Sequence, residues 1–319
     1  MPVTAAQLAA ADTNFRALYT RGLGAGFNAL NPAVMTVNSS AATETHGWLA
    51  DLPAIREKLG EYVRSEIQRL GYSLDNKTYG GIVDIPMEAF EDDQLGLYGP
   101  TITGWGEKVN PMHQSYFTDL LINGFSGTKG KDYTNGAFFG TAKKQHAKAK
   151  QSVSNKDTKK LNTANFETAL ASLQERLDSE GDPLNLGMDG AKLLLVVTAD
   201  DRSTADSIVG VQKLASGADN PNYKKATVVV LPGLKTKAQA SAVINNADAL
   251  PWFLMDVSKS VKPLIYQART PFTITSLTSP TSQQVFDQDK FSFKVRGRGN
   301  YGYGLWELAY GSTGADAAA

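Results

Sequence analysis

The amino-acid sequence predicts an α+β protein, long enough for one large domain or two modest ones. Three observations predict this class: a run rich in β-branched residues from Tyr79 to Ile85, apolar residues at helical spacing from Ile102 to Phe125, and a helix–strand–helix–strand order from Asn162 to Ile244. The chain has 319 residues, of which 42% are hydrophobic and 20% charged, a composition typical of a globular protein with a substantial core.

Composition also excludes several classes of function. Lysine and arginine together number 32, as do aspartate and glutamate, so the overall charge does not indicate a nucleic-acid or membrane partner. The chain has no cysteine, which excludes disulfides, thiolate metal sites and cysteine nucleophiles. No apolar run approaches the ~20 residues of a membrane span, and the first residues lack the basic and apolar segments of a secretory signal. We expect no cofactor and no membrane partner.

Residues 1–47 form the first segment, predicted as an N-terminal arm. Thr4 suits the start of a helix, along which apolar side chains recur. The recurring residues are Leu8, Phe15, Leu18 and Tyr19. By themselves the residues favour an ordinary first helix packed on its own chain over an arm that lies across another subunit. Residues 48–60 then predict a short connecting helix.

Residues 61–86 predict an extended β-hairpin. Its first arm passes through Tyr62 and Ile67, the chain turns near Asn76, and the second arm returns from Tyr79 to Ile85. A projecting hairpin has few partners in its own chain, and exposed strand edges commonly pair with another subunit. The candidate contact residues are Tyr62, Arg64, Asn76, Lys77 and Tyr79.

An acidic triplet, Glu91-Asp92-Asp93, follows the hairpin and precedes a longer helical region. Paired carboxylates can act as acid and base or hold a hard cation. Acids at the start of a helix are also favoured by the helix dipole, and they suit a salt bridge across an interface. We favour the second interpretation because no histidine or conventional metal-ligand spacing accompanies the triplet. Residues 87–180 are predicted to form a domain built on a long helix at about 100–125.

Residues 129–160 are rich in lysine, with nine lysines against Asp132 and Asp157. Lysines bind phosphate without sequence preference, so one interpretation is a basic loop that faces DNA or another subunit. The other interpretation is a solvated surface segment. The residues leave both open.

The middle of the chain predicts an α/β unit. A helix is expected from Asn162 to Asp178, with Asn162 or Thr163 as its N-cap. A buried strand follows at Lys192–Thr198, and another strand at Thr227–Leu231. No glycine-rich phosphate loop follows either strand, so we do not expect a nucleotide site in residues 181–250.

Residues 251–311 predict strands and a closing hairpin. Strands are expected at Trp252–Val257, Val261–Ala268 and Phe272–Leu277. The hairpin spans Phe286 to Tyr310, and its turn holds a GxGxxG pattern at Gly297, Gly299 and Gly302. We reject a dinucleotide site there because the pattern opens into an apolar strand-like run instead of a helix. Arg296 and Arg298 are expected to meet acidic groups of a neighbour, and residues 312–319 to form a disordered tail.

Several unusual motifs, in this order along the chain, resemble the major head subunit of Mu-like bacteriophages and prophages. They cover the first third and the last fifth of the chain, whereas the middle is less distinctive. The motifs are VNSS (37–40), GWLADLP (47–53), NKTY (76–79), EDDQLGLY (91–98), FLMDVSKSVKPLIYQ (253–267) and FKVRGRGNYGYGLWELA (293–309).

The resemblance implies the Hong Kong 97-type capsid fold, in which one chain contributes an N-terminal arm, an extended loop, a peripheral domain with a spine helix, and an axial domain. By this resemblance, residues 61–86 are the extended loop, 87–180 and 251–311 the peripheral domain, and 181–250 the axial domain. The resemblance also reverses the preference for residues 1–47, in favour of an arm that lies across a neighbouring subunit.

The function that the resemblance implies is structural. Copies of the chain would form pentamers and hexamers that close into an icosahedral shell around double-stranded DNA, which they contact non-specifically. No enzymatic activity is implied. The further partners implied are a scaffold, a protease, a portal and decoration proteins, and the implied location is the virion, assembled in the bacterial host cytoplasm.

Two other functions are alternatives: an α/β enzyme of unknown substrate, and a nucleic-acid-binding module that uses the lysines of residues 129–160. Against the enzyme, no serine lies in a GxSxG elbow, and His46, His113 and His146 lie in unrelated contexts that are typical of surface or packing residues. Against the nucleic-acid module, the overall charge is neutral and no basic, aromatic-studded strand is present.

Overall fold

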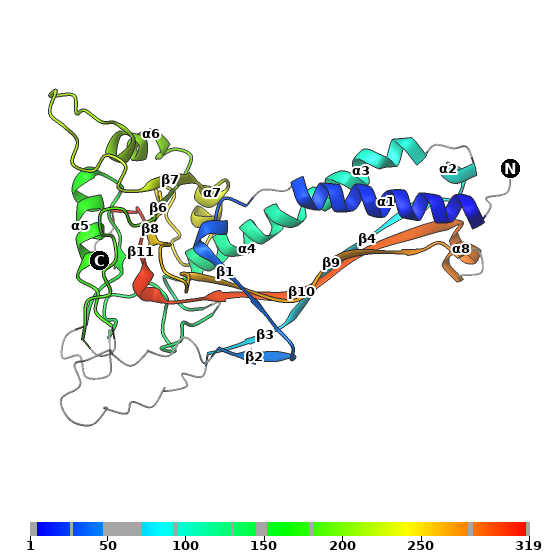
Figure 1. Ribbon diagram of the computed structural model, residues 1–319, viewed down its shortest axis with the longest axis horizontal. Coiled ribbons are helices and arrows are strands. Elements are labelled where there is room, and N and C mark those ends of the chain that lie inside the picture. The colour runs from blue at the N-terminus through cyan, green and yellow to red at the C-terminus, as the bar shows by residue number, and fades with distance from the viewer. Residues whose placement is uncertain are drawn as a thin grey trace.

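Two large β-sheets follow one another along the longest axis of the molecule, and a short two-stranded ribbon accompanies them (Figure 1). A computed structural model describes residues 5–25, 28–46, 72–91, 95–128, 130–144, 152–178, 181–279 and 283–316. Among the helices in these ranges, none combines the length and the hydropathy that crossing a bilayer requires.

The described helices and strands alternate in a mixed order, as the α+β prediction requires. The helices are α1 (Ala5–Ala25), α2 (Glu88–Glu91), α3 (Leu95–Glu107), α4 (Val109–Asn123), α5 (Thr163–Gln174), α6 (Arg202–Ala205), α7 (Leu234–Gln239) and α8 (Gln283–Gln288), with short helical turns η1 (Asn31–Ala33), η3 (Asp206–Gly210) and η4 (Trp306–Leu308). The strands are β1 (Val34–Asn38), β2 (Thr43–Thr45), β3 (Ser73–Asp75), β4 (Lys77–Pro86), β5 (Lys156–Asp157), β6 (Leu193–Val197), β7 (Thr227–Val230), β8 (Trp252–Asp256), β9 (Leu264–Leu277), β10 (Lys290–Tyr303) and β11 (Ala309–Ser312).

The first sheet, called here the long sheet, has the strand order β1-β9-β10-β4. Its two longest strands, β9 and β10, are antiparallel, and β4 pairs antiparallel with β10 from Pro86 opposite Lys290 to Lys77 opposite Gly299. The predicted strand at Tyr79–Ile85 is therefore confirmed, but it does not lack a partner in its own chain. The hairpin hypothesis is wrong on this point, because β4 pairs with a strand more than two hundred residues away.

One face of the long sheet is buried under α1 and α3. Alternate residues of β10, namely Phe291, Phe293 and Val295, point to this face and are at most 5% exposed. Phe15 of α1 meets Phe293 edge to face, with ring centroids 5.1 Å apart. Arg16 of α1 also donates a hydrogen bond to a backbone carbonyl of β9. The helix α1 thus packs on its own chain, as the residues alone predicted. The arm across a neighbouring subunit, which the resemblance implied, stays a prediction.

The helical region after β4 is divided at Lys108. The predicted long helix at about 100–125 is two helices, α3 and α4, and Pro111 lies in the first turn of α4. A proline cannot donate a hydrogen bond to the carbonyl four residues earlier, and its ring crowds that carbonyl. The carbonyl in question belongs to Glu107, the last residue of α3. Pro111 therefore explains why one predicted helix is broken in two.

The second sheet has the strand order β5-β11-β8-β6-β7 and is the centre of the α/β unit. All five residues of β6 and all five of β8 are buried, because both sides of this sheet are covered by apolar clusters. The helix α5 begins at the predicted cap, where the Asn162 side chain accepts a hydrogen bond from the backbone of Asn165. The predicted helix, its cap, the buried strand β6 and the strand β7 are confirmed; β7 is half-buried, and its Thr227 is exposed.

The C-terminal region differs most from its prediction. No turn lies at the GxGxxG glycines, which are all inside β10, and the chain next pairs in β11 with β8. The strands β8 and β11, predicted to belong with the peripheral domain, lie in the same sheet as β6. The described part of the tail also packs on the rest of the chain, since Ser312 and Thr313 are buried. The prediction of a disordered tail is therefore wrong for residues 312–316.

Candidate interaction surface

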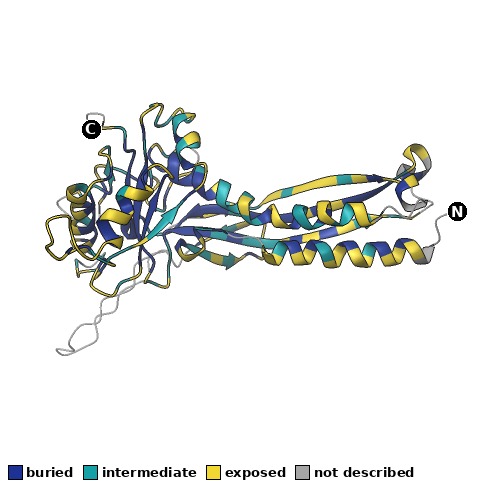
Figure 2. Ribbon diagram, turned by 90° about the horizontal axis from the view of Figure 1, so that it is seen from above, coloured by how far each residue is buried: buried dark blue, intermediate teal, exposed yellow. Residues whose placement is uncertain are grey.

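The face of the long sheet turned away from α1 and α3 is open, and we call it the outer face. It is formed by alternate residues of three neighbouring strands, and Figure 2 shows exposed positions throughout this half of the molecule. Ile82 of β4 is 64% exposed and Leu277 of β9 is 46% exposed, although antiparallel sheets normally place polar residues on an open face. The outer face is therefore partly apolar.

A row of three cations runs along the centre of the outer face. Lys294, Arg296 and Arg298 alternate along β10, so they share one face at a spacing of about 7 Å. Lys294 lies opposite Ile82 of β4 and Arg296 lies opposite Gly80. No ion pair among the described residues includes any of the three cations. We call these residues the basic row.

The predicted contact residue Arg298 is partly covered at the edge of the basic row. Its Nε atom is buried and has no hydrogen-bond partner within the described ranges. The register of β4 against β10 places Thr78 opposite Arg298 and Lys77 opposite Gly299. Lys77 therefore falls on the other face of the sheet, where it lines a hollow with Tyr79 and Tyr116. Of the predicted contact residues that the structure describes, it brings only Arg296 and Arg298 together on the outer face.

Asn76, another predicted contact residue, is used within its own chain. Its side-chain amide donates to Ser39 Oγ over 2.7 Å and to the Ala41 carbonyl over 2.8 Å. Its side-chain carbonyl accepts a hydrogen bond of 2.9 Å from the buried Gln267. These bonds fix the short β2–β3 ribbon against β9, so Asn76 acts here as an internal clamp.

Tyr79, also a predicted contact residue, lies in a cluster of rings between the long sheet and α4. Its ring centroid is 5.1 Å from that of Tyr116 and 5.9 Å from that of Tyr301. Burial raises the pKa of Tyr79 to about 12. His113 of α4 joins the cluster, with Nδ1 2.8 Å from the Tyr301 hydroxyl, and burial lowers the pKa of His113 to about 4. Tyr79 therefore contributes to packing inside the chain.

The remaining predicted contact residues are not placed by the structure. Glu91 is the last residue of α2, and nothing further is described for its side chain. Four others lie outside the described residues, namely Tyr62, Arg64, Asp92 and Asp93. The predicted connecting helix at 48–60 and the first arm of the hairpin lie outside them as well. Among the described residues, no group of three potential metal ligands comes together.

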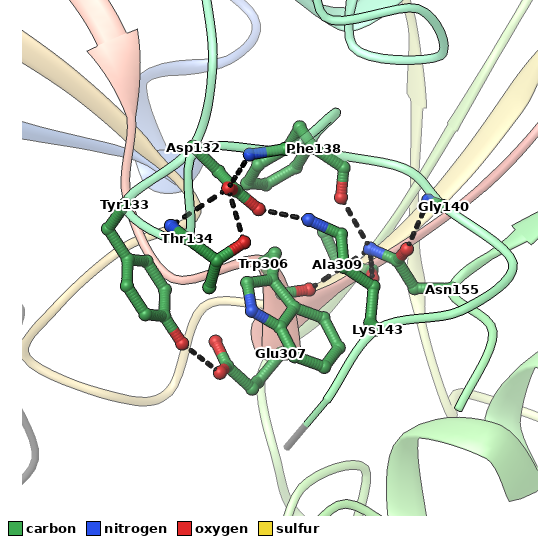
Figure 3. Close-up of polar contacts among 11 residues, drawn as sticks. Asp132, Tyr133, Thr134, Phe138, Gly140, Lys143, Asn155, Trp306, Glu307 and Ala309 are labelled. Atoms are coloured by element: carbon green, nitrogen blue, oxygen red, sulfur yellow. Dashed lines mark hydrogen bonds and ion pairs between the residues drawn. The ribbon is translucent and has the colours of Figure 1, made fainter. Parts of the chain in front are cut away.

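A buried polar cluster was not foreseen from the sequence. It joins the loop at 130–144 to the turn at Trp306 and Glu307, as Figure 3 shows. Lys143, which the two interpretations of the lysine-rich stretch placed at the surface, forms a buried ion pair with Asp132. Both interpretations are therefore wrong for Lys143. The sequence signal that could have indicated this was Asp132, an isolated acid in a lysine-rich segment that also contains Phe138 and Phe139.

Trp306 is the centre of this cluster. Lys143 Nζ lies 5.3 Å from the ring centroid and the Arg176 guanidinium lies 5.2 Å from it, so two cations contact one indole. Burial lowers the pKa of Arg176 to about 10, and the nearby Glu307 opposes that shift. The Asn155 amide donates to the carbonyls of Phe138, Trp306 and Ala309 and so holds the cluster to the core.

Comparison with known proteins agrees with these features of fold and sequence. The family model of the Mu-like prophage major head subunit gpT matches residues 8–160, 156–234 and 231–318. The Mu-like prophage FluMu major head subunit of Haemophilus influenzae is 26% identical over 278 residues, which are 87% of this chain and 64% of that protein. The major capsid protein of Escherichia phage Mu is 25% identical over 309 residues, which are 97% of this chain and 74% of that protein. The chain thus spans somewhat less than two thirds of the Haemophilus relative.

Solved structures show the same fold. A chain of the procapsid of bacteriophage JBD30 superposes with a TM-score of 0.59 at 23% identity, covering 98% of this chain and 76% of that chain. A chain of the mature capsid of bacteriophage PhiM1 gives a TM-score of 0.51 at 10% identity, covering 90% and 86%. Together with the two sheets, these similarities confirm the predicted Hong Kong 97-type capsid fold. Because the family model matches nearly the whole chain, this protein belongs to the family of Mu-like prophage major head subunits.

Proposed function

We propose that this chain is the shell-forming subunit of a phage head. Copies would associate as pentamers and hexamers, which close into an icosahedral shell around double-stranded DNA. Membership of the head-subunit family supports this function. The elongated molecule, with a long sheet that extends away from the α/β unit, also suits a subunit that contacts several neighbours (Figure 1).

The outer face of the long sheet is the observation that carries the proposal. It combines exposed apolar side chains, Ile82 and Leu277, with the basic row, which enters no ion pair among the described residues. An interface needs apolar area for affinity and complementary charges for register. The occupant we propose is a second copy of this chain that presents acidic residues to the basic row. Glu91, Asp92 and Asp93 remain the predicted acidic partners.

We infer that the chain has a structural role and no catalytic one. The two described histidines are both engaged in packing: His46 Nε2 lies 3.0 Å from the buried Gln267 side chain, and His113 contacts Tyr301. DNA contact would be non-specific, through exposed lysines, and scaffold, protease, portal and decoration proteins would act on the assembly in the host cytoplasm.

The first experiment is to measure particle mass by light scattering and to record electron micrographs of the same purified sample. We expect closed shells, tubes or rings from the native chain. Arg296→Glu should reduce assembly, whereas Arg296→Lys, which keeps the charge, should not. High salt should weaken assembly of the native chain because exposed charge pairs are screened.

Two outcomes would contradict the proposal. A native chain that stays monomeric or dimeric at high concentration, also when a scaffold is co-expressed, would remove the shell-forming function. Normal assembly of Arg296→Glu would instead show that the subunits associate without the basic row, and would leave the shell-forming function intact.

A further inference from the structure

Asp132 and Lys143 form an ion pair that differs in burial from the others in the described chain. The Asp132 side chain is 0% exposed and the Lys143 side chain 8% exposed, and Nζ contacts Oδ2 directly. In every other ion pair among the described residues, both side chains are at least 24% exposed. An amine and a carboxyl group are therefore held in contact where water is excluded.

The other carboxylate oxygen of Asp132 lies in a cradle of three donors. Oδ1 accepts hydrogen bonds from the Thr134 backbone at 2.9 Å, the Thr134 hydroxyl at 2.6 Å and the Gly136 backbone at 3.1 Å. Donors arranged in this way polarise the carboxyl carbon and stabilise negative charge that develops on the oxygen during acyl transfer. Oδ1 is thus held as the oxygen that stays, and Oδ2 faces the amine as the oxygen that leaves.

The surroundings of Lys143 fix its approach. The Trp306 ring lies 5.3 Å from Nζ, and Phe138, fully buried, lies beside the pair (Figure 3). The Lys143 side chain runs along Gly140, where an added Cβ would meet Lys143 Cε at 3.4 Å. Neighbours on several sides therefore restrict where the amine can move.

We propose that Lys143 Nζ and Asp132 Cγ condense to an isopeptide bond within the chain. The ammonium group first transfers a proton to Oδ2, which gives a neutral amine and a carboxylic acid. The amine then attacks Cγ, and the carbonyl electron pair moves to Oδ1 in its cradle. The Cγ–Oδ2 bond breaks as Oδ2 takes a second proton from nitrogen, and one water leaves. Ammonium plus carboxylate thus gives amide plus water, with no further reactant.

The burial of the pair favours this product. Two buried charges are poorly solvated, and their mutual attraction only partly offsets the loss of hydration. The amide carries no net charge, so condensation removes that penalty, and exclusion of water opposes hydrolysis. The bond would close a covalent ring over residues 132–143. This ring includes Phe138 and Phe139, both 0% exposed, and would hold them in the core.

Intact-mass spectrometry of the denatured native chain tests the bond directly. We expect a mass lower than that of the sequence by one water, about 18 Da. A linked lysine resists trypsin, so the expected fragment runs from residue 132 to residue 144 and is lighter by one water. Lys143→Arg keeps the charge but removes the nucleophilic amine. The measured mass of this variant should therefore equal the mass of its own sequence. Lys160→Arg alters an exposed ion pair, 45% and 50% exposed, and should keep the deficit.

Two results would overturn the bond. One is a native chain with the full sequence mass and normal tryptic cleavage after Lys143. The other is a loss of ammonia, about 17 Da, with cleavage after Lys143 preserved, because that combination indicates a cyclic imide at Asn135-Gly136. If Lys143→Arg fails to fold, the mass and the tryptic fragment of the native chain still decide the question.

Discussion

The ring of Phe272 on β9 lies directly against the Cα of Gly297 on β10. A Cβ added at Gly297 would come within 2.7 Å of two ring carbons, and Phe272 is itself only 9% exposed. The pairing of β9 with β10 also shifts register between Arg296 and Arg298, on either side of this glycine. Gly297 therefore lets two strands approach each other closely. It does not mark the turn that the sequence predicted.

We expect Gly297→Ala to destabilise the chain. The added methyl group must displace a buried ring, and overpacking of this kind costs about 1–3 kcal/mol. Urea unfolding of the unassembled chain measures the change. Gly104→Ala in α3 is the control, because its Cβ meets nothing within 4 Å and alanine favours a helix. Equal unfolding midpoints for Gly297→Ala and the native chain would show that the ring moves freely.

Acidification should destabilise the fold through His113. Its pKa is lowered from 6.5 to about 4 in the folded chain. Between these pH values the unfolded chain binds more protons, so the free energy of unfolding decreases as the pH falls from about 6.5 to about 4. Because His113 is partly exposed, we expect a loss of about 2 kcal/mol over this range.

The variant that tests this loss is His113→Asn, which retains a polar group near Nδ1 and cannot titrate. It should show a weaker dependence on pH when urea midpoints are compared at about pH 4.5 and about pH 7. Some dependence should remain, because burial also lowers the pKa of His46. An unchanged loss of stability in His113→Asn would assign the effect to other groups.

Asn76 and Lys77 should respond differently to substitution, although they are neighbours. Asn76→Ala removes three hydrogen bonds to Ser39, Ala41 and Gln267, and we expect a loss of about 1–3 kcal/mol in the isolated chain. Lys77→Ala removes an exposed side chain and should leave unfolding unchanged. Thermal unfolding of both variants measures this. A stable Asn76→Ala chain would show that the clamp is unnecessary.

Lys237 links the two halves of the molecule. Its Nζ donates from α7 to the Ser115 carbonyl at 2.8 Å, the Ser115 hydroxyl at 2.6 Å and the Asp119 carboxylate at 2.9 Å, all on α4. Lys237→Met keeps the apolar stem and should lose about 1–2 kcal/mol. Lys235→Met, which alters an exposed pair with Asp200, is the matched control and should have little effect. Similar unfolding of both variants would exclude a special role for Lys237.

The candidate interaction surface was predictable only in part. Arg296 and Arg298 were singled out from the sequence, and they do belong to the basic row on an open face. Lys294 was missed because it was read as part of a hairpin arm and not as the start of a row. Asn76 and Tyr79 were singled out too, but their side chains are engaged inside the chain. Exposure of a polar residue depends on its partners, which local sequence does not contain.

The sequence by itself determined the local elements. Local sequence patterns predicted three of these elements: the Asn162 cap, the apolar strand β6 and the β-branched run in β4. Such patterns suffice because capping and hydrophobic periodicity act over a few residues. The tertiary structure alone decided which elements meet. It pairs β4 with β10, runs that strand straight through Gly297, and buries Lys143 against Asp132. These outcomes depend on contacts between residues far apart in the chain, where packing selects among partners that local patterns leave equivalent.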